Sequence, residues 1–380
     1  MSRLEQKLAA LHCQYRYRQR RVLPVEADDL SVLNFAENDY LGLRRHPQVI
    51  AACAAAAKKY GVGSGASALI SGYSYEHQQL EQELADFLGY EKTLVFSSGY
   101  LANLAVLTSL CMRGDIIYSD KLNHASLIDG ARLSRAEVRR YPHADVSSLA
   151  KSLANDALGS SQKQGYILSD GVFSMDGDIA PYLALGELAN QHKARLIIDD
   201  AHGVGIMGSA GRGSWDEHGP VADILIGTLG KAFGTQGAYV AGNEQQIEWL
   251  VQTGRSYVYS TALAPPLVAA SRASLRLLRA GDNLRSELAA NISYFRSGAE
   301  HLGLELLPSC TAIQALVLGQ EERLLRWADT LLKAGILVGA IRPPTVAEGS
   351  SRLRITLSAT HNQTQINQLL QGLHKCQQHT

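Results

Sequence analysis

The stretch Thr228-Leu229-Gly230-Lys231-Ala232-Phe233-Gly234 is the best guide to how this chain folds. It directly follows the apolar run Ile224–Ile226, which predicts a buried strand that ends in a glycine-rich turn. A lysine is costly to bury unless its amine is paired or used. Lys231 is therefore a candidate nucleophile that could form a Schiff base. The alternative is an ordinary loop lysine that points into solvent.

A second apolar run, Arg195 to Ile198, lies upstream and ends in Asp199-Asp200-Ala201-His202-Gly203. Enzymes that use pyridoxal phosphate need a lysine for the cofactor aldehyde and an acid for the ring nitrogen. Lys231 and Asp199 follow two predicted strands and supply these two groups. The pair predicts a site for this cofactor.

Composition excludes several other classes of protein. The 380 residues allow two or three domains, and the 36 basic residues balance the 36 acidic ones, so no bulk charge favours nucleic acid or a membrane. The five cysteines form no CxxC pair, which favours free thiols and gives no sign of a metal site. We find no apolar run long enough for a membrane helix, and charges stand where a signal peptide needs its apolar core. A soluble, cytoplasmic protein is expected.

Strands and helices alternate through the first two thirds of the chain. This order predicts right-handed βαβ units and a mainly parallel sheet, with ligands beyond the carboxyl ends of the strands. Gly99, Ser174, Asp199, His202 and Lys231 all fall at such ends. The predicted strands are 93–96, 115–118, 138–141, 165–169, 195–199 and 224–226, and the predicted helices are 48–60, 76–88, 101–110 and 182–192.

Two glycine-rich segments need separate interpretations. Ser97-Ser98-Gly99-Tyr100 stands between a strand and a helix, which is the arrangement that binds phosphate at a helix N-terminus, although many such turns only cap a helix. Gly61-Val62-Gly63-Ser64-Gly65 follows a helix, so it does not fit a dinucleotide-binding fingerprint. We expect a turn near a ligand or a subunit contact there.

The two ends of the chain differ from its middle. Residues 3–20 predict an amphipathic helix whose end carries Arg16, Arg18, Arg20 and Arg21, either as cations at a helix C-terminus, as an anion-binding arm or as part of a transit peptide. A long helix over 266–302 is expected to lead into a smaller domain with strands at 312–318 and 352–357 and helices at 321–334 and 363–376. We divide the chain at 1–45, 46–265 and 266–380.

Seven stretches together resemble the α-oxoamine synthases, a family of pyridoxal-phosphate enzymes of fold type I, and the resemblance spans nearly the whole chain. It implies a large domain with a mainly parallel sheet and a smaller C-terminal α/β domain. The stretches are Asn38–Leu43, Gly63–Gly65, Ser98–Tyr100, Asn123–Ser126, Gly171–Asp178, Asp199–Gly203 and Thr228–Lys231. One departure is Asp170, where similar synthases often have glutamate, and a small shift in hydrogen bonding near the cofactor ring is expected.

The resemblance implies roles around the cofactor ring. Lys231 would bind the cofactor covalently and, once the amino acid has displaced it, remove the Cα proton. Asp199 would pair with the ring nitrogen, and His124 would stack on the ring face beside the substrate. His202 would bond the phenolic oxygen, and Ser174 would lie near the ring.

The resemblance also implies how the phosphate is held. Backbone groups of Gly99 and Tyr100, together with Thr228, would surround it. In relatives a Ser/Thr pair such as Ser260-Thr261 reaches the phosphate from the partner subunit. A homodimer with shared active sites is therefore implied.

Substrate contacts are implied in the same way. Asn38 and Arg354 would hold the carboxylate of the amino acid, and Arg20, or Arg21 in a competing alignment, would line the acyl channel with Thr345. In Ser351–Leu357 the alternation places Arg352, Arg354 and Thr356 on one face of a strand. For Arg352 we expect a solvated face, and for Arg354 substrate binding.

The resemblance implies a decarboxylative condensation. The stretch Ala340–Val346 favours members that join L-alanine to the pimeloyl thioester of coenzyme A or of a carrier protein. The first alternative is a member that uses glycine and acetyl-CoA. The second is a non-catalytic phosphate- or nucleotide-binding protein with the same kind of sheet.

Overall fold

A computed structural model gives the structure of residues 2–22, 32–156, 158, 163–214 and 221–378. The chain forms two compact units. The large unit comprises Leu41–Phe173 and Ile179–Arg285, and the small unit comprises Met1–Tyr40, Ser174–Asp178 and Ser286–Thr380. Within the described residues, no helix combines the length and the apolar character that crossing a membrane requires.

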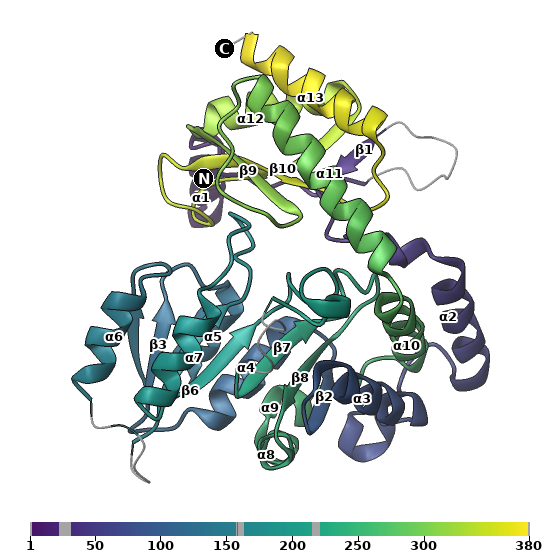
Figure 1. Cartoon of the computed structure of the whole chain (residues 1–380), viewed down its shortest axis with the longest axis vertical. Coiled ribbons are helices and arrows are strands. Elements are labelled where there is room, and N and C mark those ends of the chain that lie inside the picture. The colour runs from purple at the N-terminus through teal and green to yellow at the C-terminus, as the bar shows by residue number, and fades with distance from the viewer. Residues whose placement is uncertain (1, 23–31, 157, 159–162, 215–220, 379–380) are drawn as a thin grey trace. The chain divides into compact units, whose positions relative to one another are not determined.

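The large unit is built on a seven-stranded sheet in the order β2-β8-β7-β6-β5-β3-β4 (Figure 1). Neighbouring strands from β7 to β4 are parallel, whereas β8 is antiparallel to both β7 and β2. The predicted mainly parallel sheet is confirmed. Its strands are β2 (Lys92–Phe96), β3 (Ile116–Asp120), β4 (Glu137–Tyr141), β5 (Gly165–Asp170), β6 (Arg195–Asp199), β7 (Ile224–Thr228) and β8 (Ala238–Gly242).

Helices pack against this sheet. Residues of helix α4 such as Ala105, Val106 and Leu107 are fully buried against strands that carry Ile197 and Val240. The helices of the large unit are η1 (Leu43–Arg45), α2 (Pro47–Tyr60), η2 (Ala68–Gly72), α3 (Tyr75–Leu88), α4 (Gly99–Leu110), α5 (Ala125–Leu133), α6 (Val146–Ala154), α7 (Tyr182–Gln191), η3 (Ser209–Gly211), α8 (Glu244–Thr253), α9 (Arg255–Val258) and α10 (Pro265–Arg279).

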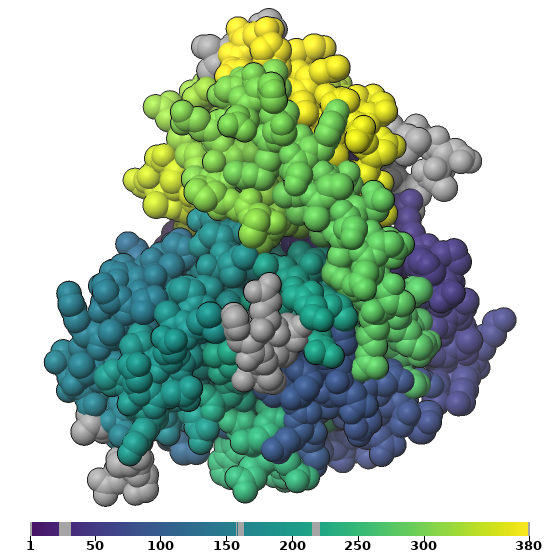
Figure 2. Space-filling view, viewed as in Figure 1, coloured from purple at the N-terminus to yellow at the C-terminus, as the bar shows by residue number. Residues whose placement is uncertain are grey.

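The small unit holds a four-stranded sheet in the order β1-β10-β11-β9. Strand β1 runs parallel to β10, and the other pairs are antiparallel. Figure 2 shows helices α11 (green) and α13 (yellow) side by side, where Tyr294 Oη donates to Asn367 Oδ1 at 2.8 Å. The elements are α1 (Arg3–Cys13), β1 (Leu33–Phe35), α11 (Asp282–His301, in this unit from Ser286 on), β9 (Ile313–Gly319), α12 (Glu321–Lys333), β10 (Ile336–Ile341), β11 (Ser351–Thr356) and α13 (Gln363–Gln378).

Two predicted helices are wrong in extent. The N-terminal helix ends at Cys13 and not near residue 20, because Tyr15 takes a φ of 56° and the N–H groups of Arg16 and Tyr17 both turn back to Leu11 O. The predicted helix over 266–302 is two helices, α10 and α11, which are separated at Ala280 and Gly281. Ala280 N and Gly281 N still bond to the last turn of α10 and close it.

Candidate active site

The turn that carries Lys231 begins where β7 ends, as predicted. Leu229 N donates to Gly237 O and Thr235 N donates to Leu229 O, both at 2.9 Å, so the turn closes on itself. Gly234 has a φ of 66°, and a Cβ there would lie 2.3 Å from Arg44 N, so only glycine fits. The Lys231 side chain is partly buried, and its Nζ lies 2.7 Å from His202 Nε2.

Asp199 is the last residue of the neighbouring strand β6 and is only 6% exposed. Its Oδ1 accepts from Ala201 N at 3.1 Å, and its Oδ2 accepts from Asn103 Nδ2 at 2.7 Å. Asn103 lies on α4 and is not among the predicted site residues. Donors on both oxygens hold the carboxylate in one orientation.

His124 lies at the N-cap of α5, and its backbone is held by Asp170, the last residue of β5. The N–H of His124 donates to Asp170 Oδ2 at 2.6 Å, and Asp170 N donates to Asn123 Oδ1 at 2.9 Å. Burial lowers the pKa of His124, and Lys231 lowers it further, whereas Asp199 opposes both. The imidazole is therefore kept neutral, with Asp170 as the residue that fixes its backbone.

Three buried carboxyl groups lie at the ends of strands β5 and β6. Asp170 is the last residue of β5, Asp199 is the last residue of β6, and Asp200 directly follows it. Burial raises the pKa of Asp170 well above its usual range, and the charge of Asp199 adds to the rise. Burial also raises the pKa of Asp200 to about 7, although Ser214 donates to this carboxyl from its N–H at 3.0 Å and its hydroxyl at 2.6 Å. Burial and the nearby charge of Asp199 disfavour the charged form of Asp170, and a cation bound beside these carboxyl groups would offset that cost.

The predicted phosphate turn opens helix α4 at the end of strand β2. Ser98 Oγ accepts from Leu101 N at 3.3 Å and caps the helix, and the N–H groups of Gly99 and Tyr100 lie in a first turn, where no helix carbonyl precedes them. A Cβ at Gly99 would meet only Ala238 Cβ at 4.0 Å. Thr228 Oγ1 donates to Gly237 O and accepts from Gly230 N, so it fixes the lysine turn.

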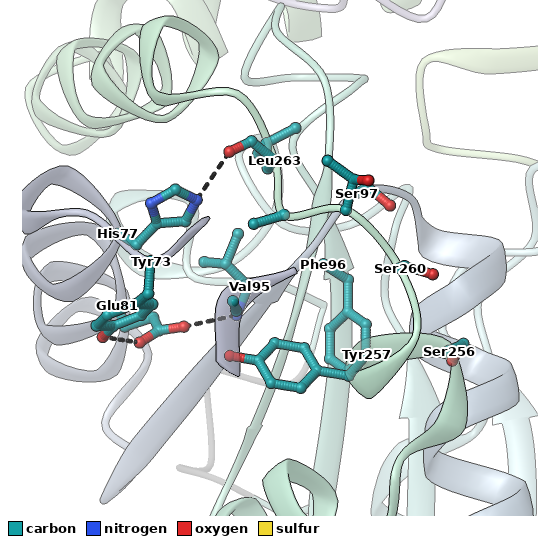
Figure 3. Close-up of a pocket in the computed structure, with 13 residues that line it drawn as sticks. Tyr73, His77, Glu81, Val95, Phe96, Ser97, Ser256, Tyr257, Ser260 and Leu263 are labelled. Atoms are coloured by element: carbon teal, nitrogen blue, oxygen red, sulfur yellow. Dashed lines mark hydrogen bonds between the residues drawn. The ribbon is translucent and has the colours of Figure 1, made fainter. Parts of the chain in front are cut away.

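Ser260 and Thr261 line a small pocket beside Phe96 and Ser97, immediately before the phosphate turn (Figure 3). Thr261 forms an isolated β-bridge with Ser67, so the glycine-rich segment after α2 is held next to it. Helix α3 supports this pocket. Figure 3 shows Glu81 accepting from Tyr73 Oη at 2.6 Å and from Val95 N at 2.9 Å, and His77 Nε2 lies 2.8 Å from Leu263 O.

In the small unit, Arg354 on β11 is 7% exposed and brings two other predicted residues together. Its guanidinium donates to Ser174 O at 2.6 Å, to Asn38 Oδ1 at 3.0 Å and to Thr356 Oγ1 at 3.1 Å. All three acceptors are neutral. Burial raises the pKa of Tyr40 to about 12, and the positive charge of Arg354 opposes this rise.

The solvated position predicted for Arg352 is wrong. Arg352 is only 7% exposed, forms an ion pair with Asp176 and donates to Ser350 O at 2.9 Å. All residues of β11 are buried, because the segment Ser174–Asp178 supplies partners to the arginine face of the strand. Nothing in the local alternation reveals this cover.

The basic segment that contains Arg18, Arg20 and Arg21 is exposed at all three arginines. Arg18 Nη2 donates to Thr345 Oγ1 at 3.0 Å, and Arg21 lines an open groove with Arg342. Arg18 therefore joins Asn103 among the candidate residues that sequence reasoning missed. Its only signal was membership of the same basic run, which could not single it out.

The described residues contain no group of three or more His, Cys, Asp or Glu side chains that could hold a metal ion. The site therefore consists of an amine, buried carboxylates, histidines and a helix N-terminus in the large unit. The small unit, taken by itself, holds a buried arginine with neutral partners.

Comparison with known proteins gives one consistent result. The aminotransferase class I and II family model matches residues 31–373. An 8-amino-7-oxononanoate synthase of Cellvibrio japonicus is 47% identical over 98% of this chain and 96% of its own length, and one of Saccharophagus degradans is 48% identical with the same coverage.

Solved structures agree with these relatives. A serine palmitoyltransferase of S. paucimobilis superposes with a TM-score of 0.92 at 29% identity, over 99% of this chain and 97% of that one. An 8-amino-7-oxononanoate synthase of Francisella tularensis gives a TM-score of 0.79 at 33% identity, over 92% and 98%. The chain therefore belongs to the aminotransferase class I and II family and, within it, to the same group as the 8-amino-7-oxononanoate synthases.

Proposed function

We propose that this chain is a pyridoxal-phosphate-dependent 8-amino-7-oxononanoate synthase of biotin biosynthesis. It joins L-alanine to a pimeloyl thioester, and it releases the thiol and carbon dioxide. Identity of about 47% over nearly the full length of synthases with this name supports the assignment. The observation that carries it is the 2.7 Å contact between Lys231 and His202, because it puts an amine at the edge of the sheet where strand β6 ends in the buried Asp199.

The residues of the large unit fit pyridoxal phosphate by the chemistry of their donors and acceptors. The amine of Lys231 suits an aldehyde, the carboxylate of Asp199 suits a protonated ring nitrogen, and the first turn of α4 at Gly99 and Tyr100 suits a phosphate. When bound, the cofactor acts as an electron sink for the Cα of an amino acid.

Lys231 and His202 are proposed to handle protons. The two nitrogens lie within hydrogen-bond distance, so His202 can accept a proton from Lys231 or orient its lone pair. His124 stays neutral because burial lowers its pKa, so its ring can stack on a flat ligand without adding positive charge. Asp170 accepts a hydrogen bond from the backbone N–H of His124 and so fixes the position of this residue.

Arg354 and Asn38 are proposed to bind the carboxylate of alanine. Arg354 is buried, and its described partners are all neutral oxygens, so its charge is not balanced by a side chain. A planar guanidinium binds a carboxylate through two parallel hydrogen bonds, which fixes orientation as well as affinity. Ser174 is proposed to act close by, because its carbonyl oxygen accepts from Arg354.

We assign the binding of the far end of the acyl chain to the basic segment of residues 16–21 and to Thr345. The contact of 3.0 Å between Arg18 and Thr345 favours Arg18 over Arg20 as the partner of a terminal carboxylate. Arg18→Ala should raise the KM for the pimeloyl thioester and leave the KM for alanine unchanged, and Arg20→Ala is the matched control from the same arm. A larger effect from Arg20→Ala would return the role to Arg20.

A homodimer with shared sites is the proposed assembly. Val62, Ile70 and Tyr259 are 86%, 80% and 74% exposed, and they flank the segment in which Ser67 pairs with Thr261. Apolar side chains exposed in this number mark an interaction surface. In this assembly Ser260 and Thr261 would reach the phosphate of the partner. None of the five cysteines, which all lie in the described residues, forms a disulfide bond, and this supports the proposed cytoplasmic location.

One assay separates the proposed function from its alternatives. The purified protein is incubated with alanine and pimeloyl-CoA or a pimeloyl carrier protein, and in parallel with glycine and acetyl-CoA. Turnover with the first pair supports the proposal, and preference for the second pair identifies a 2-amino-3-ketobutyrate ligase instead. A protein that binds no pyridoxal phosphate and turns over neither pair is a phosphate-binding protein without catalysis.

A further inference from the structure

One side-chain amide in the large unit bonds to two separate parts of the candidate site. The Nδ2 group of Asn103 donates to Asp199 Oδ2 at 2.7 Å and to Ser126 Oγ at 2.8 Å. Ser126 Oγ in turn lies 2.7 Å from His124 Nδ1. All three of Asn103, Asp199 and Ser126 are buried, with Asn103 only 1% exposed.

The donor and acceptor roles in this chain of contacts are fixed by elimination. An amide nitrogen has two hydrogens and no acceptor, so Ser126 Oγ must accept from Asn103 and can direct its own hydrogen to His124 Nδ1. The N–H of Ser126 points to the same Nδ1 at 3.3 Å. In the neutral imidazole of His124, Nδ1 is therefore the acceptor and Nε2 carries the hydrogen.

A packing role does not explain this amide. Asn103 lies on the buried side of α4 with Ala102, Ala105 and Val106, and a leucine there would avoid the cost of burying an amide. The Oδ1 atom of Asn103 is buried and has no hydrogen-bond partner among the described residues. The amide is thus held by its donor side alone, toward Asp199 and Ser126.

We propose that Asn103 is a positioning residue that orients the Asp199 carboxylate toward the cofactor's ring nitrogen and, through the Ser126 hydroxyl, supports the tautomer of His124 that the Ser126 N–H also favours. The proposal rests on pyridoxal phosphate being the cofactor, as proposed above. One N–H donates to Asp199 Oδ2 and orients the carboxyl group, whose oxygens have further lone pairs available for a protonated ring nitrogen. The second N–H fixes the direction of the serine hydroxyl.

The test compares two ligands that differ only at the ring nitrogen. Pyridoxal phosphate and 1-deazapyridoxal phosphate, in which C–H replaces the nitrogen, are titrated into cofactor-free wild type and Asn103→Leu, and each Kd is measured by absorbance. Because a hydrogen bond to a charged group is worth about tenfold or more in an equilibrium, we expect the substitution to reduce the preference for pyridoxal phosphate about tenfold. A purely structural role weakens both ligands equally, and that result, or no change, overturns the proposal.

Two further variants keep the result unambiguous. Ser126→Ala retains the bond between Asn103 and Asp199, so it should keep the wild-type preference, and a loss as large as that of Asn103→Leu overturns the assignment to Asp199. Asn291→Leu removes another buried amide, one that donates to Ser358 O at 3.0 Å and His361 O at 2.7 Å in the small unit. It should lower the Tm of the cofactor-free protein without changing the preference.

If Asn103→Leu does not fold, Asn103→Ala carries the same comparison, because it adds no bulk. The measurement uses neither alanine nor a thioester, so it does not depend on the identity of the substrates. If the protein lacks the proposed synthase activity, its preference for pyridoxal phosphate over 1-deazapyridoxal phosphate can still be measured. If the proposed role of Asn103 is wrong, the turnover assay still tests the synthase activity. A preference that stays at the wild-type value in Asn103→Ala overturns the inference.

Discussion

The two units bury different kinds of ionisable group. In the large unit the carboxyl groups of Asp170, Asp199 and Asp200 are buried at the ends of adjacent strands, and burial raises the pKa of Asp170 and Asp200. In the small unit the guanidinium groups of Arg352 and Arg354 are buried on one strand, and only Arg352 has a carboxylate in an ion pair within the described residues.

This difference indicates what each unit binds. Buried charges are stable only when they are paired or hydrogen-bonded. Buried carboxyl groups whose charged form is disfavoured are stabilised by a cationic group such as a protonated ring nitrogen, and an arginine without a carboxylate partner favours an anion such as a carboxylate. This difference supports the proposal that the large unit binds the cofactor and the small unit binds the acid end of an amino acid.

The largest effect is expected from Lys231→Ala. Turnover should fall below detection, because this variant lacks the amine that lies 2.7 Å from His202. The cofactor should still bind without a covalent link, since the carboxylates of the large unit are unchanged. Borohydride reduction followed by mass spectrometry should find a pyridoxyl label on the Lys231 peptide of the wild type. A label on another lysine would contradict the assignment.

Asp199→Asn tests the role of the buried carboxyl groups in the large unit. The variant should fold and bind cofactor but lose about a hundredfold or more in turnover, because a neutral amide cannot keep a ring nitrogen protonated. Steady-state kinetics at saturating cofactor measures the loss. Asp200→Asn is the control from the same cluster, since Asp200 bonds to Ser214 and Tyr182. Equal losses in the two variants would show that the acid is not Asp199 in particular.

Arg354→Lys and Arg352→Lys test the roles of the two buried arginines in the small unit. Lysine keeps the charge but loses the planar fork, so Arg354→Lys should raise the KM for alanine about tenfold or more. Arg352→Lys should leave that KM near the wild-type value, because Arg352 is bonded to Asp176 and Ser350. Initial rates with alanine varied at fixed thioester measure both. A similar rise for both variants would remove the distinction between them.

Much of this arrangement could be predicted from the sequence. The runs around Ile198 and Ile226 predicted strands, and the residues at their ends followed from the rule that parallel strands end at one edge of a sheet. Strand β8, Ala238–Gly242, was not predicted, since short alanine and glycine side chains give no strong period. The break between α10 and α11 was missed because the apolar pattern continues across Ala280 and Gly281.

Contacts between distant segments account for the remaining misses. The burial of Arg352 depends on Asp176, and the contact of Arg18 with Thr345 joins residues more than three hundred positions apart. Asn103 lies in an apolar helix, where a single amide could as well be a tolerated polar residue. The hydrophobic periodicity and the motifs of a sequence describe local structure. Contacts between distant segments arise only in the tertiary fold, so they cannot be deduced from these patterns.

The smallest effect is expected from Glu81→Gln. This variant is also a control for the cluster of Asp170, Asp199 and Asp200. Burial raises the pKa of Glu81 from 4.5 to about 7, close to that of Asp200, but its partners Tyr73 and Val95 lie around the pocket of Figure 3. Between pH 4.5 and 7 the folded protein binds more protons at Glu81 than the unfolded chain does, so the free energy of unfolding falls as pH rises.

Glutamine does not titrate, so the Tm of Glu81→Gln should fall less than that of wild type between pH 5 and pH 8. The difference should correspond to about 1–3 kcal/mol, or a few degrees in Tm. Thermal unfolding of the cofactor-free protein at several pH values measures it, and Asp170 and Asp200 contribute equally to both proteins. The difference should persist when pyridoxal phosphate is added, because Glu81 lies outside the carboxylate cluster. If the cofactor abolishes it, Glu81 is coupled to that cluster, and the two buried carboxyl environments cannot be treated as separate.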